Sequence, residues 1–413
     1  MAPSSFLQNL SDEEDRISTL PDHILLDILE RLNDLRAVIK AGTLARRWVH
    51  LPRSASRLLL DVADFVPRDS DGRERRAVPR NSMDQVMTAY TTTLMRLVSS
   101  SGVQTIKNMQ LSFFLRDPYM HSIGHAVGDV VERGKTDHLK LIIWPDTRNP
   151  TYEQSVLFGE RFMVFFRSCP TTFRWLTSLD LKDITFGGSD VSTLLNTCSK
   201  LEFLSLTYCD SAFDLVTGED TVLTINAPHS ALLSLEMTSC EFKRIDLIHA
   251  PKLCRLVCSN WIGANPPVSF GDVPCLHHVA LCCAASHQQR PFMLSHCLFN
   301  TSTLSVVYLN FQQQLIWVEP EGPKHLSLIF SNLRDVYLYN IFYKCDLNWT
   351  IFILEAAPSL NNFYLKLSRH QCESFRCDED SANKVNMTWD QTSPHLKHKQ
   401  IEEDSLARST ALC

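Results

Sequence analysis

A short phrase of apolar residues recurs along most of the chain. It consists of an apolar residue, two residues of any kind, a second apolar residue, one further residue and a third apolar residue, and it first occurs at Ile106, with Met109 and Leu111. Side chains of a β-strand point alternately to its two faces, so the second and third apolar positions share one face and the residue between them lies on the other. Each copy therefore predicts one short, half-buried strand. The further copies begin at Leu139 (with Ile142 and Trp144), Leu176, Leu201, Leu232, Leu253, Leu276, Leu304, Leu333 and Leu360.

The segments between the copies carry two further signals. Apolar residues at positions i, i+3, i+4 and i+7 predict helices around 123–131 and 191–198. A dipeptide of an apolar residue and proline precedes several copies by a similar small number of residues. These dipeptides are Ala227-Pro228, Ala250-Pro251, Val273-Pro274 and Ala357-Pro358.

Together these patterns predict an α/β fold, an irregular leucine-rich repeat solenoid over residues 83–370. The copies begin 21 to 37 residues apart, scattered around the roughly 20 to 29 residues that are typical of leucine-rich repeats. We expect parallel strands on the concave side and helices or turns on the convex side. No repeat covers its own apolar face, so several must stack, with a cap at each end. The alternative is an ordinary α/β domain with leucines in its strands, and the regular proline dipeptides favour the repeat.

Residues 14–60 follow a helical pattern instead. Pro21 suits the first turn of a helix, and Asn33 and Asp34 interrupt that helix and can cap a second one. Three short helices enclose little core, so part of their apolar surface should be available to a partner. A small helical cap on a larger domain is the alternative. The helices carry Ile24, Leu25, Ile28, Leu29 and Leu32, then Leu35, Val38 and Ile39, then Leu44, Trp48 and Leu51.

An ordered set of short motifs within this region resembles the F-box of plant F-box proteins. The motifs are Asp15-Arg16-Ile17-Ser18, Leu20-Pro21, Ile24-Leu25-Leu26-Asp27-Ile28-Leu29 and Leu44-Ala45-Arg46-Arg47-Trp48. The resemblance implies a three-helix F-box that binds a Skp-type adaptor, which links the chain to a cullin-RING ubiquitin ligase. The adaptor-binding residues that it implies are Leu20, Pro21, Ile24, Leu25, Ile28, Leu32, Val38, Leu44 and Trp48.

Three polar stretches flank these regions. We expect residues 1–13, which are polar and acidic, to be disordered. We expect residues 61–82 to form an exposed linker, because residues 64–82 combine prolines, a glycine and dense charge without apolar periodicity. The basic cluster at 73–80 in that linker fits a solvated loop better than a nuclear-import or phosphate-binding patch. Residues 371–413 lose the repeat phrase. Their segments 386–390 and 395–398 resemble the opening of the FBD domain, which predicts a partial FBD-like, poorly ordered tail.

Composition adds little about partners but narrows the compartment. The formal net charge of −6, from 46 acidic and 40 basic residues, is too near balance to indicate nucleic acid or an anionic membrane surface as a partner, and we expect neither. The N-terminus is acidic and lacks the features of a signal peptide, and no stretch is apolar enough to span a membrane. The 14 cysteines are spread along the chain, so we expect reduced thiols and a cytoplasmic or nuclear protein.

No motif supports catalysis or a bound cofactor. Gly134-Lys135-Thr136 lacks the earlier glycine of a phosphate-binding loop and follows a predicted helix where a strand is needed. The cluster of His277, His278, Cys282, Cys283 and His287 lies on a predicted repeat strand, and His370, Cys372 and Cys377 lack paired ligand spacing, so we expect no metal. Cys209 and Cys240 occupy the turn position where leucine-rich repeats place Asn or Cys, which predicts structural thiols.

The resulting hypothesis is a non-catalytic substrate-recognition subunit of a Skp/cullin/F-box ligase. The helices would hold the adaptor, and the repeats would present an unknown target protein through outward residues such as Ser205, Ser234 and Tyr337. Two alternatives stay open. One is a receptor whose repeats bind a hormone-like small molecule that completes the target interface. The other is a repeat-mediated interaction protein that does not engage the ligase.

Overall fold

The structure is a computed structural model of the chain. It describes residues 20–21, 24–25, 57–66, 80–99, 106–134, 136–212, 222–261, 265–283, 291–312, 316–343 and 345–368. The chain divides into two compact units, Met1–Ile142 and Ile143–Cys413. Within the described residues, no helix has the length and apolar character needed to cross a bilayer.

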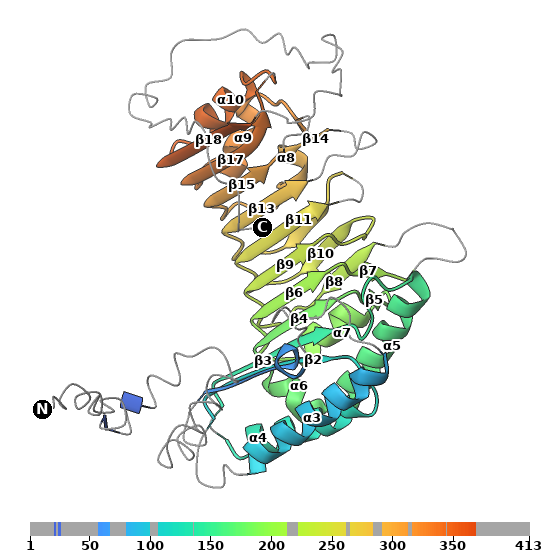
Figure 1. The fold of residues 1–413 in the computed structure, drawn as a ribbon. Helices are drawn as coiled ribbons and strands as arrows, with labels where there is room; N and C mark the ends of the chain where they lie inside the picture. The colour runs from blue at the N-terminus through green and yellow to red at the C-terminus, as the bar shows by residue number, and fades with distance from the viewer. Residues whose placement is uncertain are drawn as a thin grey trace, which may run out of the picture. The chain divides into compact units, whose positions relative to one another are not determined.

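The described part of the first unit combines short parallel strands with the helices α3 and α4 (Figure 1). Strand β1 pairs in parallel with β2, with Leu58 opposite Met109 and Leu60 opposite Leu111. The sequence pattern did not predict β1, which begins inside the range that we assigned to the N-terminal helices. The described elements are β1 (Arg57–Asp61), the 3-10 helix η3 (Val62–Phe65), α3 (Arg80–Ser99), β2 (Asn108–Phe114), α4 (Tyr119–Glu132) and β3 (His138–Trp144), which runs into the second unit.

The predicted start of the repeat phrase at β3 was wrong. We expected Leu139 to begin a copy of the phrase and Ile142 and Trp144 to point inward, but Leu139, Leu141 and Ile143 are the buried residues. Trp144 is 38% exposed. The phrase in fact begins three residues earlier, at Thr136, which is buried although it is not apolar. Because threonine at the first position is not apolar, the sequence pattern did not identify the true start of this copy.

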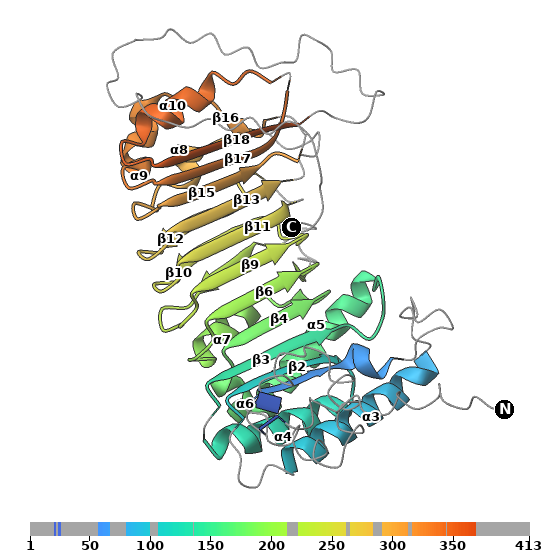
Figure 2. The same ribbon diagram turned by 60° about the vertical axis from the view of Figure 1, so that its left-hand side comes forward.

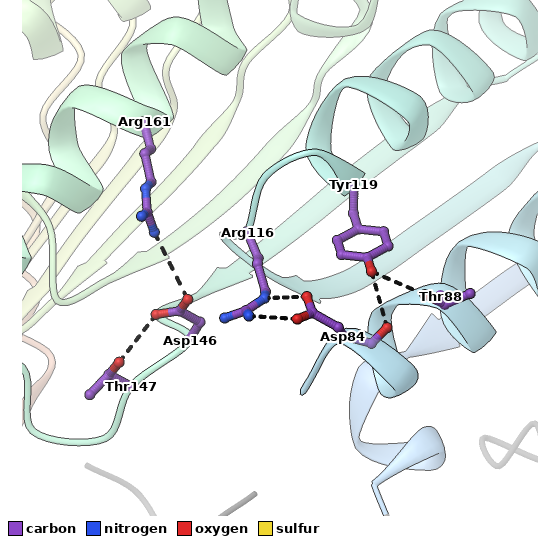
Figure 3. Close-up of polar contacts among 7 residues, drawn as sticks. All are labelled: Asp84, Thr88, Arg116, Tyr119, Asp146, Thr147 and Arg161. Carbon is purple, nitrogen blue, oxygen red and sulfur yellow. Dashed lines mark hydrogen bonds and ion pairs between the residues drawn. The ribbon is translucent and has the colours of Figure 1, made fainter. Parts of the chain in front are cut away.

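Polar contacts attach helices to the ends of strands in both units (Figure 3). In the first unit, the Arg116 guanidinium, which follows β2, makes two hydrogen bonds to the Asp84 carboxylate of α3, at 2.7 and 2.9 Å. The Tyr119 hydroxyl also donates to the backbone carbonyl of Asp84, at 3.1 Å. In the second unit, the Asp146 carboxylate, which follows β3, lies 3.9 Å from the guanidinium of Arg161 in α5. Both carboxylates hold a helix against a strand end.

The second unit contains a stack of eight parallel strands in the order β4-β6-β9-β11-β13-β15-β17-β18 (Figure 1). Adjacent strands pair without offset over their central residues, as in Leu204 opposite Leu235 and Leu235 opposite Leu256. The repeat prediction is confirmed for all eight strands. They are β4 (Ser178–Lys182), β6 (Phe203–Thr207), β9 (Ser234–Thr238), β11 (Arg255–Trp261), β13 (His278–Cys283), β15 (Val306–Asn310), β17 (Asp335–Phe342) and β18 (Asn362–Ser368).

The inward positions of these strands form the core of the second unit. Leu204, Leu235 and Leu256 are fully buried, and so are Leu206 and Leu281. Burying a leucine side chain contributes about 1.5 to 3 kcal/mol. The contribution arises only when the neighbouring repeat covers the side chain, so each strand depends on the next.

A layer of helices and short strands covers one face of the stack (Figure 2). The predicted helix at 191–198 is α7, and the helix at 123–131 in the first unit is α4. In the middle of the second unit, however, the layer consists of a three-stranded sheet in the order β12-β10-β8. Its elements are α5 (Tyr152–Ser168), α6 (Pro170–Trp175), β5 (Thr185–Phe186), α7 (Asp190–Thr197), β7 (Asp210–Ser211), β8 (Leu223–Asn226), β10 (Ile245–His249), β12 (Val268–Asp272), β14 (Phe292–Met293), α8 (Leu294–Cys297), β16 (Val318–Glu319), α9 (Pro323–Phe330) and α10 (Trp349–Ala356).

The proline dipeptides mark the turns that lead from this layer back to the main sheet. The amide of Leu253 donates to the carbonyl of Ala250, at 3.1 Å, and the amide of Leu360 donates to the carbonyl of Ala357, at 3.2 Å. In both turns proline is the second residue, where its fixed φ angle is favoured and its missing N–H is not needed. The dipeptides therefore predicted the end of each covering element.

Helix α5 approaches the short strand β5 too closely for a side chain at the contact. A Cβ atom added at Gly159 would lie 1.9 Å from the carbonyl oxygen of Thr185. Beside this contact, Phe173 of α6 packs edge-on against Phe165 and Phe166, with ring centroids 5.1 Å apart in both pairs. The glycine thus lets α5 pack against β5 beside this aromatic cluster.

We predict that Gly159→Ala lowers the free energy of unfolding by about 3 kcal/mol, because overpacking against backbone costs about 1 to 3 kcal/mol and this overlap is severe. Urea unfolding followed by circular dichroism measures the change. The matched control is Gly188→Ala, since a Cβ atom there meets nothing within 4 Å. Equal midpoints for the two variants would contradict the close contact.

Candidate interaction surface

The face of the main sheet opposite the covering layer carries the outward side chains of β4 to β18, and we call it the open face. Because the strands pair in register, these side chains form rows along the stack. The first row is Ser178, Phe203, Ser234, Arg255, His278, Val306, Asp335 and Asn362. The middle row is Asp180, Ser205, Glu236, Val257, Ala280, Tyr308, Tyr337 and Tyr364. The last row is Lys182, Thr207, Thr238, Ser259, Cys282, Asn310 and Tyr339.

All three residues that we predicted for target contact lie on the open face. Ser205 and Tyr337 belong to the middle row, and Ser234 belongs to the first row. Each is partly exposed. Their contact with a target stays a prediction. The same phrase identifies the outward position of every strand. It could therefore also have identified the neighbours of these residues on the open face, which we did not name.

An ion pair crosses the rows beside Ser234. The Arg255 guanidinium bonds to the Glu236 carboxylate, and it also donates to the Ser234 hydroxyl, at 3.3 Å. Burial lowers the pKa of His278 on the next strand, and the nearby Arg255 lowers it further, against the opposing effect of Glu236. His278 is therefore neutral near pH 7, and the two charges at the centre of the open face compensate each other.

Four tyrosines on the last three strands form the tyrosine cluster: Tyr308, Tyr337, Tyr339 and Tyr364. The rings of Tyr337 and Tyr364 are stacked, with centroids 4.7 Å apart and an interplanar angle of 1°. Tyr308 stacks on Tyr339, with centroids 5.2 Å apart and an angle of 22°. Tyr337 and Tyr364 are register partners on neighbouring strands, so their rings stack at about the strand spacing, whereas Tyr308 contacts Tyr339 diagonally. The result is a continuous aromatic area on the open face.

A carboxylate lies at one end of this cluster. Asp335 precedes Tyr337 by two residues on the same strand, and its Oδ1 atom accepts a hydrogen bond from the Asn362 side chain, at 2.6 Å. Burial raises the pKa of Tyr337, and the charges of Asp335 and Tyr364 raise it further. The Tyr337 phenol therefore stays protonated at physiological pH and remains a hydrogen-bond donor.

Side-chain amides continue the polar surface where the strands end. Gln312 donates to the side-chain oxygen of Asn260, at 2.6 Å, and Asn340 donates to that of Asn310, at 3.0 Å. The Ser368 hydroxyl donates in turn to the side-chain oxygen of Asn340, at 3.0 Å. Asn260, Gln312 and Asn340 have φ angles between 50° and 55°, in the left-handed region that asparagine tolerates best after glycine. The chain therefore turns at these positions, and the side-chain amides of Gln312 and Asn340 are hydrogen-bonded.

A lysine lies between two aromatic rings at the other end of the stack. The Nζ atom of Lys182 lies 5.3 Å from the ring centroids of both Trp144 and Tyr208, within the range of a cation–π interaction. Tyr208 is 55% exposed. Here an aromatic pair already holds a cation from its own chain.

The structure describes four of the predicted adaptor-binding residues. The amides of Ile24 and Leu25 both donate to the carbonyl of Pro21, at 3.0 and 3.1 Å, as in a first helical turn. Ile24 is 38% exposed, Pro21 is exposed and Leu25 is fully buried. Leu20 is partly exposed. The other predicted residues lie outside the described part of the chain: Ile28, Leu32, Val38, Leu44 and Trp48.

The prediction of structural thiols at the strand ends is confirmed. The Cys240 thiol donates to the carbonyl of Leu206, at 3.4 Å, and the Cys209 thiol donates to that of Leu181, at 3.8 Å. Burial raises the pKa of Cys240 to about 12, and burial raises the pKa of Cys209 as well. Both residues therefore bridge neighbouring repeats as neutral thiols.

Of the remaining candidates for chemistry, His287, His370, Cys372 and Cys377 lie outside the described residues. The side chain of His277 is exposed, and its Nδ1 atom lies 3.0 Å from the carbonyl oxygen of Thr303. No group of three or more potential metal ligands gathers among the residues that the structure describes. Gly134 follows helix α4, as the sequence predicted, and not a strand.

Comparisons with known proteins agree with this architecture. Residues 165–411 match the family model for the leucine-rich repeat domain of the At1g61320/AtMIF1 type. The chain is also 25% identical over 236 residues to the F-box/FBD/LRR-repeat protein At1g13570 of Arabidopsis thaliana, over 56% of this chain and 49% of that protein. The aligned part thus spans about half the length of this relative. Because the repeat-domain match covers more than half of the chain and its described strands stack as repeats, the chain belongs to the At1g61320/AtMIF1 leucine-rich repeat domain family.

Proposed function

We propose that this chain is the substrate-recognition subunit of a Skp/cullin/F-box ubiquitin ligase. Residues 14–60 bind a Skp-type adaptor, and the open face binds the target protein. The observation that carries the proposal is the joint presence of the ordered F-box motifs and a stack of repeats with an open face. The similarity to a relative named as an F-box/FBD/LRR-repeat protein supports it.

The composition of the open face suits protein recognition. Its rows are rich in tyrosine, serine, threonine and asparagine, and its central ion pair is internally compensated. Tyrosine offers a large, rigid contact area at a low cost in side-chain entropy, and short polar side chains adapt their hydrogen bonds to a partner. The open face therefore has the features of a protein-binding surface.

The role of such a subunit is to hold two proteins together. A target bound to the repeats and an adaptor bound to the N-terminal helices are joined by one chain, so each is present near the other at a raised effective concentration. Transfer of ubiquitin then depends on groups supplied by other subunits. The chain contributes binding and orientation.

We predict that replacing Leu20, Pro21 and Ile24 together by alanine reduces capture of a purified Skp-type adaptor at least tenfold, because a few apolar contacts usually dominate an interface. Pro21 is exposed and Ile24 is 38% exposed, so the loss should be mainly intermolecular. A pull-down with the full-length chain measures capture.

The control for this variant is Leu328→Ala, which removes an exposed apolar side chain from α9, 79% exposed. It should leave capture unchanged. Urea midpoints of both variants test whether the repeats stay folded. Undiminished capture by the triple variant would overturn the adaptor assignment and leave a repeat protein that does not engage the ligase.

We also predict that Ser205→Arg combined with Ser234→Arg removes target binding without affecting the adaptor. Two long charged side chains on the open face would block a complementary surface and bring unpaired charge into it. The measurement is affinity purification from plant cells with the cullin inhibited, comparing proteins retained by the native chain and by the variant.

A matched substitution on the covered side is Ser327→Arg in α9, where the side chain is exposed. Proteins that depend on the open face should be retained by this control and lost by the double variant. If both variants retain the same proteins, target recognition lies elsewhere on the chain.

A further inference from the structure

The aromatic pair around Lys182 and the tyrosine cluster differ in one respect. Trp144 and Tyr208 enclose the ammonium of Lys182, at 5.3 Å from each ring centroid. At the tyrosine cluster, the rings of Tyr337 and Tyr364 stack on each other, and a carboxylate stands beside them. Among the residues that the structure describes, no cationic side chain contacts Asp335, Tyr337 or Tyr364.

The polar groups at this end of the cluster are also incompletely used. Asp335 accepts one side-chain hydrogen bond, from Asn362 at 2.6 Å. No described residue forms a hydrogen bond with the hydroxyls of Tyr337, Tyr339 or Tyr364. The Asp335 carboxylate can therefore accept further hydrogen bonds, and the phenol groups can still donate and accept them.

The charge on this part of the open face is distributed along the strands. Asp335 lies in the first row, and Lys366 follows Tyr364 by two residues at the opposite end of the tyrosines. Lys366 lies four residues along β18 from Asn362, the register partner of Asp335, which is about 13 Å of strand. A cation brought to Asp335 is therefore attracted by the carboxylate and kept away from the Lys366 ammonium.

We propose that Asp335 and the tyrosine cluster receive an arginine side chain of the target protein. The proposal rests on the function proposed above, in which the open face binds the target, and it names the chemistry of one contact. The guanidinium would pair with the Asp335 carboxylate and lie against the Tyr337 and Tyr364 rings, as Arg255 pairs with Glu236 elsewhere on the same face.

Arginine fits this site better than lysine for two physical reasons. Its planar fork of N–H groups can meet both oxygens of a carboxylate at once, whereas an ammonium acts as a point charge. The flat guanidinium also stacks on aromatic rings and is less strongly hydrated, so it loses less on leaving water. A partly covered carboxylate beside stacked phenols offers both contacts together.

The test uses the full-length chain and three fluorescein-labelled peptides of equal length. One alternates arginine and serine, the second replaces each arginine by citrulline, its neutral isostere, and the third replaces each arginine by glutamate. Fluorescence anisotropy measures binding. We expect the arginine peptide to bind about tenfold more tightly than the citrulline peptide, the effect of one charge-assisted hydrogen-bonded pair.

Two matched variants locate the site. Asp335→Asn keeps the shape of the side chain and its contact with Asn362 but removes the charge, and it should weaken arginine-peptide binding about tenfold. Glu319→Gln removes one negative charge from an exposed position on β16 in the covering layer and should leave binding unchanged. Tyr364→Ala should weaken binding as well, because it removes one face of the aromatic contact.

Equal binding of the arginine and citrulline peptides, or equal losses in Asp335→Asn and Glu319→Gln, would overturn the proposal. So would tighter binding of the glutamate peptide, which would assign the site to Lys366. Adaptor capture by the same protein is measured in parallel. Failed capture with intact arginine preference would refute the ligase role alone, and intact capture without arginine preference would refute the arginine site alone.

Discussion

The structure depends on one constraint: a single repeat cannot cover its own apolar face. Leu204, Leu235 and Leu256 reach full burial only because strands β6, β9 and β11 pair in register. The same register places the outward side chains in straight rows. The core and the candidate interaction surface therefore both depend on the register of the strands, and a displaced strand would disturb both.

Much of the fold could be predicted from the sequence, because the repeat phrase reports burial directly. The main strands of the second unit begin where the phrase places them, and turns such as Ala250-Pro251 end the covering elements. The failures have local causes. Thr136 takes a buried position that the phrase reserves for apolar residues, and so it shifted the prediction for β3. Strand β1 has the alternation of Leu58 and Leu60 but no preceding copy to set its phase.

The candidate surface could be predicted only in part. Alternation places Ser205 and Tyr337 outward, but it does not say which outward residues become neighbours. The loops between strands differ in length, so the pairing of Tyr337 with Tyr364 or of Arg255 with Glu236 depends on how each loop folds. The contact between Asp335 and Asn362 likewise arises only when β17 and β18 lie side by side. Side-chain contacts between repeats are thus a property of the stack.

The buried thiols at the strand ends have a chemical consequence. Cys209 and Cys240 bond to carbonyls of a neighbouring repeat, and burial keeps their pKa far above physiological pH. A thiol must lose its proton to attack an electrophile or a disulfide. These sulfurs therefore stay inert towards oxidants and alkylating agents for as long as the stack is intact, and their reactivity would report its opening.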